Sequence, residues 1–382
     1  MGTPSPLTSR QQAVEFVREL QRLVNAHDTA GLAALYAEDA VTVSPMFPLI
    51  CGRDAIASSW NRIFTLFPDW SVNVSDVLVD GDRIAFVGSA GATDVNGWFG
   101  QAPTGERIEY RAIIVLTIAS SGIVRDERIY DLSGILERLE KSRLQRELET
   151  AREVQRTLLP PLNYSNSYCE AAADSVACRA IGGDFFEMLP LPSGNLGIAL
   201  GDVAGKGPAS ALLASMIQGM LMAETEAESR PSQVLARLNR ALFCKRVEPR
   251  FATLVYGVLS PDGRLVYSNA GHNPPLMLTR NNIRRLTTGG RILGSFSEST
   301  FEEGMLCLNE QDTIIMFSDG VVEAQDAHDR EFGEERLISC VRGARTLPAQ
   351  EILRKIFARF QEFCSGHPQS DDVSVSVIRS LG

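Results

Sequence analysis

Two aspartates on glycine-flanked turns are the residues of this sequence whose type and spacing best suit chemistry. Asp184 stands in the motif GGDFFE, and Asp202 follows eighteen positions later in the motif GDVAGKG. The apolar run 196–200 predicts a strand between them. Glycine lets the backbone turn sharply and approach a ligand closely. A carboxylate on such a turn is a suitable ligand for a hard divalent cation.

Two further acidic turns follow later in the chain. Asp319 lies in FSDG directly after the apolar run 313–317, and Asp371 and Asp372 precede the β-type run 373–378. A single turn of this kind would carry little weight, because such turns are common in loops. Four turns at strand ends, with no histidine or cysteine ligand pattern beside them, indicate an all-oxygen site suited to magnesium or manganese. Clustered carboxylates repel one another unless cations hold them, which disfavours a purely structural interpretation.

The elements expected to position these aspartates fill residues 161–382. Runs of β-type composition predict strands at 196–200, 251–259, 264–269, 275–278, 313–317 and 373–378. Helical patterns between and after them predict helices at 208–223, 231–243 and 349–363. Two clusters of strands with helices between and after them predict a β-sandwich with helical outer layers.

Residues 8–134 follow a different order. Apolar residues recur at helical spacing over 13–24, over 32–36 and after the turn at 52–54. From Trp70 onward the period changes to two, which is typical of strands in one antiparallel sheet. Three helices followed by a curved sheet predict an α+β cone with a closed end, so the chain as a whole is predicted to be α+β.

Residues 135–160 are predicted to form one long connecting helix. The segment is rich in strong helix formers and lacks glycine and proline until Pro160. Steps of four and three residues give it a heptad seam made of Leu144, Leu148, Ala151, Gln155 and Leu158. We favour pairing with a second copy as a coiled coil, because so charged a helix must cover its apolar edge. The alternative is a single helix packed on its own domains.

Ordered motifs give the second segment a family resemblance. GGDFFE, GDVAGKG, NAGHNPP, FSDGVVEA, EFGEERL and SDDVSV occur in this order. Together they resemble the metal-dependent serine/threonine protein phosphatases of the SpoIIE/RsbU group, within the wider PPM class. The resemblance implies an αββα sandwich that binds two ions, Mn²⁺ or Mg²⁺. It also implies the metal ligands, which are Asp184, Asp202, the backbone carbonyl of Val203, Asp319 and Asp371, with Asp372 as a further candidate. Arg179 is placed like an arginine that contacts substrate phosphate in some relatives.

The same resemblance implies a reaction and a partner. A water activated by the two ions attacks a phosphoserine or phosphothreonine in line, and no protein nucleophile is needed. The expected substrate is a phosphorylated STAS-type anti-sigma-factor antagonist. Two alternatives stay open at this point. One is a non-catalytic regulator whose phosphatase fold only binds a partner, and the other is a small-molecule enzyme in the first segment fused to a phosphatase.

The first segment resembles the SnoaL-like domains of the nuclear-transport-factor-like superfamily. The resemblance rests on the order of the elements and on the runs LAALYAEDAV, GRDAIASSW and RDERIYD. Such cones host isomerases, dehydratases and pure binding domains alike. We expect a sensor domain with a small-molecule pocket, for which the candidate lining is Tyr36, Trp60, Phe64, Tyr110 and Tyr130. Aromatic residues at strand spacing also serve as plain core packing. His27 and Asp131 are the candidates for acid/base roles there.

Composition limits the remaining choices. A net charge of −10 and a pI of about 5.1 argue against nucleic acid or an anionic membrane as the main partner. The seven cysteines are odd in number and show no CxxC pair, which indicates reduced thiols. No apolar run approaches the roughly 18 residues of a membrane-spanning helix, and no signal-peptide pattern opens the chain. The sequence therefore predicts a cytoplasmic location.

Overall fold

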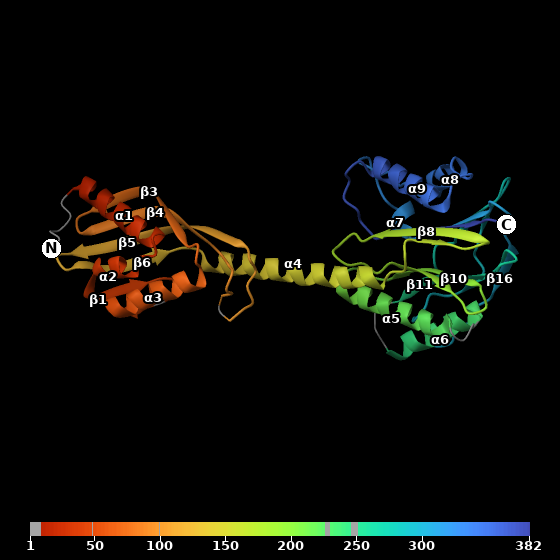
Figure 1. The fold of residues 1–382 in the computed structure, drawn as a ribbon, viewed down its shortest axis with the longest axis horizontal. Coiled ribbons are helices and arrows are strands. Elements are labelled where there is room, and N and C mark those ends of the chain that lie inside the picture. Colours follow the sequence, from red (N-terminus) through yellow and green to blue (C-terminus); the bar gives the residue numbers. More distant parts are fainter. Residues whose placement is uncertain (1–8, 48, 99, 226–229, 246–250) are drawn as a thin grey trace. The chain divides into compact units, whose positions relative to one another are not determined.

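The chain folds into two compact units in the computed structural model. The structure describes residues 9–47, 49–98, 100–225, 230–245 and 251–382. The first unit is Met1–Glu147 and the second is Leu148–Gly382. Each unit is built around its own sheets, so each is described by itself (Figure 1).

In the described residues of the first unit, helices pack on one curved sheet. The helices are α1 (Arg10–Asn25), α2 (Thr29–Ala34) and α3 (Arg53–Leu66). The sheet has the order β2-β1-β6-β5-β4-β3, and its strands are β1 (Tyr36–Val43), β2 (Ile50–Cys51), β3 (Ser71–Asp80), β4 (Arg83–Thr93), β5 (Arg107–Ala119) and β6 (Gly122–Ile129). All neighbouring strands are antiparallel except β1 and β6, which are parallel.

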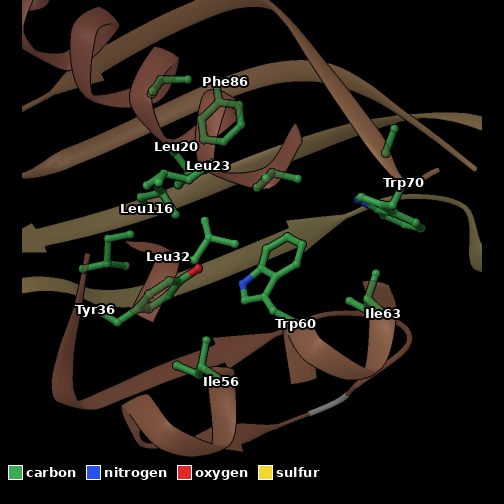
Figure 2. Packing of buried hydrophobic residues seen from close by; sticks show 14 of the residues in the cluster. Leu20, Leu23, Leu32, Tyr36, Ile56, Trp60, Ile63, Trp70, Phe86 and Leu116 are labelled. Atoms are coloured by element: carbon green, nitrogen blue, oxygen red, sulfur yellow. The ribbon is translucent and has the colours of Figure 1, made fainter. Parts of the chain in front are cut away.

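Helix α1 shows how the sequence specifies this packing. Ser9 caps the helix through a reciprocal pair of hydrogen bonds with Gln12, which satisfies donors that would otherwise lack partners. Apolar residues then recur on one helical face and are buried. They pack against residues of α2, α3 and the sheet in a single core (Figure 2).

The second unit contains two facing sheets. One has the order β15-β12-β11-β10-β9, with β16 (Gly304–Cys307) also paired to β12, and consists of β9 (Phe185–Pro190), β10 (Leu196–Val203), β11 (Ala252–Leu259), β12 (Arg264–Ala270) and β15 (Gly289–Gly290). The other has the order β14-β13-β17-β18-β8-β7, formed by β7 (Asn163–Ser165), β8 (Cys169–Val176), β13 (Leu276–Leu278), β14 (Ile283–Arg285), β17 (Thr313–Phe317) and β18 (Val373–Ser380).

Helices cover the outer faces of both sheets. Figure 1 shows α5 (Pro208–Thr225) and α6 (Pro231–Lys245) on the side of β10 and β11, and α8 (Gly333–Arg342) and α9 (Ala349–Cys364) on the side of β8. One apolar core lies between the sheets, and a further core lies beneath each helical layer. This is an αββα sandwich, as the sequence predicted.

Helix α4 (Leu132–Leu158) is continuous and contributes residues to both units. Its first turns bury Ile135 and Leu139 in the core of the first unit. In the predicted heptad seam, Leu144 and Leu158 are 56% and 50% exposed, so an apolar edge does remain on the helix. No helix in the described ranges is long and apolar enough to cross a membrane.

The predicted elements agree with the structure except at a few places. The helix expected at 32–36 is wrong at its end, because α2 stops at Ala34 and Tyr36 already begins β1. In the second unit, the elements that were not predicted are β7, β8, β9, β14, β15, β16, α7 (Asp319–Val322) and α8. The segment of β8 is rich in alanine, which has little strand propensity, and the contacts of its neighbour β18 decide its conformation. The domain limits drawn at residues 134 and 160 stay a prediction.

Strand β6 offers a matched test of the first core. Ile123 is fully buried and Ile129, on the same strand, is 59% exposed. Ile123→Ala is expected to lower the free energy of unfolding of the first unit by about 2–5 kcal/mol. Ile129→Ala should lower it by less than about 1 kcal/mol. Tryptophan fluorescence during urea unfolding measures this directly, because all three tryptophans lie between residues 60 and 98. Equal losses for the two variants would contradict the described core.

Candidate functional site

The turn before β9 lies against the end of β10. The two strands pair antiparallel, with Gly201 opposite Phe185. A side chain on Gly183 would meet the Val203 carbonyl oxygen at 2.7 Å and Asp202 Oδ1 at 3.5 Å. The turn can approach β10 this closely because residue 183 is glycine. As a result, the carboxyl groups of Asp184 and Asp202 are in hydrogen-bonding contact.

Asp184 is almost fully buried. The residue is only 6% exposed, and its Oδ2 atom has no hydrogen-bond partner among the described residues. Burial raises the pKa of Asp184 well above its usual range, and the charge of Asp202 raises it further. Hydrogen bonds from the hydroxyl groups of Ser374 and Ser318 act in the opposite direction. A buried acceptor without a partner costs about 1–3 kcal/mol, so the position favours a partner that a cation can supply.

The second sheet contributes Asp319 and Asp371. Asp319 begins the short helix α7 (Asp319–Val322) directly after β17, and Asp371 precedes the neighbouring strand β18. A side chain on Gly320 would collide with the carbonyl oxygen of Asp372, so the two turns are in close contact. Burial raises the pKa of Asp319, and the nearby charge of Asp371 is the next cause.

Lys206 links the two sheets through the motif GDVAGKG. Its ammonium group lies 2.9 Å from Asp371 Oδ2 and donates to the backbone carbonyl of Ser370. Asp371 raises the pKa of Lys206, which keeps the lysine charged. The side chain is about one-third exposed. A positive charge that solvent can reach therefore stands at the edge of the carboxylate group.

Asp372 is engaged with the backbone of the loop that carries Asp184. Its Oδ1 accepts from the Cys178 N–H at 2.8 Å, and its Oδ2 accepts from Gly183 at 2.7 Å and Asp184 at 3.4 Å. These three hydrogen bonds from one loop satisfy the carboxylate of Asp372, which explains how a residue only 4% exposed can carry it. Asp372 therefore positions the loop. Its suggested role as a metal ligand stays a prediction.

The predicted aspartates are thus brought together from four separate turns. The pKa of Asp202 is raised to about 7, first by burial and then by the charges of Asp319, Asp371 and Asp372. Repulsion of this kind is relieved when a hard cation binds between the oxygens. The donor set contains carboxylates, a strand-end carbonyl and a buried oxygen without a partner, and it fits divalent metal ions.

Sequence reasoning missed several polar residues that build this site. Ser318 and Ser374 contact Asp184, and both lie inside motifs, next to or near the predicted ligands. Gln155 was assigned to the heptad seam, but its side chain binds Gly182. Its Nε2 donates to the Gly182 carbonyl at 2.8 Å, and its Oε1 accepts from the Gly182 N–H at 3.3 Å. No local signal in the connector distinguishes such a contact from a seam position.

A small cavity of about 40 Å³ lies beside this contact. Arg152, Gln155 and Arg156 line one side of it, and Asp184 and Asp372 are among the residues on the other. The end of α4 therefore brings positive charge close to the aspartates. Arg179 is exposed in the loop between β8 and β9, and its predicted contact with phosphate stays a prediction.

Comparisons with known proteins agree with this geometry. Residues 192–380 match the family model described as stage II sporulation protein E (SpoIIE), and residues 17–126 match the SnoaL-like domain. One segment of the chain is therefore similar to SnoaL-like domains and another to SpoIIE, and the two are called the SnoaL-like domain and the SpoIIE domain below. The SpoIIE match begins after Asp184, so the placement of that residue depends on the structure itself.

Individual relatives resemble about three-fifths of this chain. Phosphoserine phosphatase RsbU of Bacillus subtilis is 28% identical over 246 residues, covering 61% of this chain and 70% of RsbU. Protein IcfG of Synechocystis is 27% identical over 262 residues, which cover 61% of this chain but 41% of IcfG. The solved SiaA-PP2C domain of Pseudomonas aeruginosa superposes with a TM-score of 0.55 at 19% identity, over 63% of this chain and 97% of that domain. This last likeness concerns the fold alone.

The SnoaL-like domain contains a separate cavity. Four of the five aromatic residues predicted to line a pocket do so, namely Tyr36, Trp60, Tyr110 and Tyr130. Phe64 lies outside this lining and stacks on His27 at 4.2 Å and on Trp60 at 5.5 Å.

The two acid/base candidates of this domain also lie away from that cavity. His27 bonds to the Trp70 carbonyl through Nε2 at 2.9 Å, and Asp131 accepts from the Gly134 N–H at the start of α4. Neither residue is among those that line the cavity.

The raised pKa of Asp202 makes a prediction about pH. Between about pH 4 and pH 7, Asp202 is protonated in the folded, metal-free chain and ionised in the unfolded chain. The free energy of unfolding therefore falls as pH rises through this range. Asp202→Asn removes that cost. It should raise the free energy of unfolding at pH 8 by on the order of 1–3 kcal/mol in the presence of a chelator, and change it little at pH 4.

Asp262→Asn provides the control, because Asp262 is largely exposed in a hairpin of the same unit. It should change stability by less than about 0.5 kcal/mol at both values of pH. Circular dichroism during denaturant unfolding measures both variants. A lower stability of Asp202→Asn than of the parent at pH 8 would contradict the repulsion described for this site.

Proposed function

We propose that the SpoIIE domain is a metal-dependent protein serine/threonine phosphatase that hydrolyses phosphoserine or phosphothreonine on a regulatory protein. The observation that carries the proposal is the convergence of Asp184, Asp202, Asp319 and Asp371 from four turns of two sheets. The name of the relative RsbU, a phosphoserine phosphatase, supports the choice of substrate class.

The proposed metal ligands are Asp184, Asp202, the Val203 carbonyl, Asp319 and Asp371. Two ions, Mn²⁺ or Mg²⁺, would supply Lewis-acid activation of a water and neutralise the charge that develops on the phosphoryl group. The residues of the chain do the rest. Buried serine hydroxyls orient Asp184, and the Asp372 carboxylate fixes the loop that carries it.

Basic residues around the site suit an anionic substrate. Lys206 and Arg179 reach solvent, and Arg152 and Arg156 line the small cavity beside Asp184. Guanidinium groups bind phosphate through paired hydrogen bonds, and an ammonium group binds it as a point charge. We assign substrate phosphate to this basic rim, with Arg179 as the contact that the family resemblance suggests.

The regulatory setting is also a proposal. We infer that the substrate is a phosphorylated STAS-type antagonist of an anti-sigma factor, and that the SnoaL-like domain acts as the sensor. Helix α4 joins the two domains, and its exposed residues Leu144 and Leu158 offer an edge for pairing with a second copy. The expected cytoplasmic location stays a prediction.

A partner-binding role without catalysis is the second candidate. It would be favoured by loss of ligand aspartates, yet all of the proposed ones are present in this sequence. An enzymatic role of the SnoaL-like domain has less support, because neither His27 nor Asp131 lines its cavity.

Removal of single ligands tests the catalytic proposal. Asp202→Ala and Asp319→Ala should each lower metal-dependent phosphate release from a phosphoserine protein by more than about 100-fold. This loss exceeds the one that is typical when a residue hydrogen-bonded to a metal ligand is replaced. Asp262→Ala, at an exposed hairpin of the same domain, should keep the rate within about twofold of the parent. Retained activity in both ligand variants, with circular dichroism unchanged, would refute the proposal.

The contact between Gln155 and Gly182 makes a second prediction. Gln155→Ala frees the loop that carries Asp184, so the Mn²⁺ concentration for half-maximal rate should rise about tenfold or more. High Mn²⁺ should restore most of the maximal rate, because the ligands themselves remain. Glu153→Ala is the control, since Glu153 is exposed on the same helix. An unchanged Mn²⁺ requirement of Gln155→Ala would show that the contact does not position the loop.

A further inference from the structure

Lys206 occupies a carboxylate oxygen of the proposed metal site. Its ammonium group lies 2.9 Å from Asp371 Oδ2 and also donates to the Ser370 carbonyl. The other oxygen of the same carboxyl group, Asp371 Oδ1, accepts from the Asp372 N–H at 2.9 Å. Both oxygens of Asp371 therefore have a donor. The lysine supplies the one donor that does not come from the backbone of the turn itself.

The turn that carries Lys206 leaves its side chain room to move. Gly205 and Gly207 flank the lysine with φ angles of +99° and +88°, which glycine adopts readily and other residues rarely do. A Cβ atom added to either glycine would meet no atom within 4 Å, so the turn is not packed against neighbouring side chains there. The side chains of Lys206 and Asp371 are 34% and 43% exposed. The ammonium group can therefore leave Asp371 without disturbing a packed element.

A divalent cation and this ammonium group compete for Asp371. Two positive charges on one carboxylate repel each other, and solvent screens this pair only in part because both side chains are partly buried. The charge of Lys206 also opposes the rise in the pKa of Asp319, so it acts on two of the proposed ligands. While the metal site is empty, the lysine compensates part of their negative charge. A cation that binds Asp371 must displace it.

We propose that Lys206 exchanges Asp371 for the substrate phosphate when a metal ion binds, and so makes metal binding precede substrate binding. In the metal-free chain the ammonium group holds Asp371 and lowers the affinity for divalent ions. Once displaced, it binds a phosphate oxygen of the substrate as a point charge. The inference rests on the proposed function, because it gives a task to one residue of the basic rim.

A purely structural link between two turns is the alternative role of this ion pair. Lys206 follows β10 of one sheet, and Asp371 precedes β18 of the other. If the pair served only to hold these turns together, its loss would loosen the proposed ligands and weaken metal binding. Competition predicts the opposite, namely tighter metal binding. The sign of one measured change therefore separates the two roles.

Calorimetric titration of the metal-free full chain with Mn²⁺ measures that sign. Lys206→Met keeps the unbranched stem but removes the charge, so the apparent Kd for Mn²⁺ should fall about tenfold, which corresponds to about 1.4 kcal/mol. Lys206→Gln should change the Kd in the same direction, which guards against a folding defect of one variant. Lys206→Arg keeps a cation at Asp371, so its Kd should not fall. Lys355→Met, at an exposed lysine of α9, should leave the Kd within about twofold of the parent.

Inorganic phosphate provides the second readout, through the shift and line width of its phosphorus NMR signal. It should bind the parent chain saturated with Mg²⁺ and bind the chelator-treated parent at least about tenfold more weakly. Lys206→Met saturated with Mg²⁺ should bind phosphate about tenfold more weakly than the parent, whereas Lys355→Met should match the parent. Tighter metal binding together with weaker phosphate binding in one variant is a result that a loosened site would not give.

Three results would overturn the proposal. These are unchanged or weaker Mn²⁺ binding by Lys206→Met with an unchanged circular dichroism spectrum, unchanged phosphate binding by the same variant, and equal phosphate affinity of the metal-free and metal-loaded parent. Each leaves the catalytic proposal standing as long as the parent binds Mn²⁺ and releases phosphate from a phosphoserine protein. A parent chain that binds no divalent ion would refute the proposed function itself, and this inference with it.

Discussion

Electrostatic repulsion among buried carboxylates is the constraint on which the second domain depends. Asp184 and Asp202 are in contact, and each has a raised pKa because burial and neighbouring negative charges disfavour ionisation. A fold keeps such an arrangement only if the surrounding packing is strong enough to hold it. Here the apolar core between the sheets and the close approach at Gly183 hold the turns together. The packing of the sandwich therefore offsets the free-energy cost of bringing the aspartates together, and bound cations would compensate their negative charge.

Two kinds of residue stabilise this arrangement without belonging to the proposed ligands. Asp372 and Gln155 both bind the backbone of residues 178–184. Asp372 lies in the turn before β18, and Gln155 lies in α4. Lys206 brings a positive charge to Asp371. Because the end of α4 holds the loop, the position of this helix is coupled to the geometry of the proposed metal site within the second unit. This coupling gives the proposed regulation a structural basis.

The sequence predicted the fold, and it singled out the aspartates that the structure brings together, because both leave local or periodic signals. Glycine-flanked aspartates at the ends of apolar strands mark turns that face one sandwich edge, and their order along the chain carries the family resemblance. Contacts between distant residues leave no such signal. The sequence pattern placed Gln155 in the heptad seam and gave no sign of the buried contacts of Asp126. It also did not distinguish Phe64 from Trp60 as a pocket residue. Only the three-dimensional packing separates these roles, because they depend on which side chain a neighbouring element happens to meet.

The most direct test of the central claim is a calorimetric titration of the metal-free full chain with Mn²⁺ at several values of pH and in buffers of different ionisation enthalpy. The account predicts that two ions bind per chain and that binding releases protons at pH 7, because a carboxyl group with a pKa of about 7 must lose its proton when a cation binds. Proton release from Asp202 should fall as the pH rises above 7. Binding without proton release at pH 7, or no binding of Mn²⁺ or Mg²⁺ by the folded chain, would contradict the account.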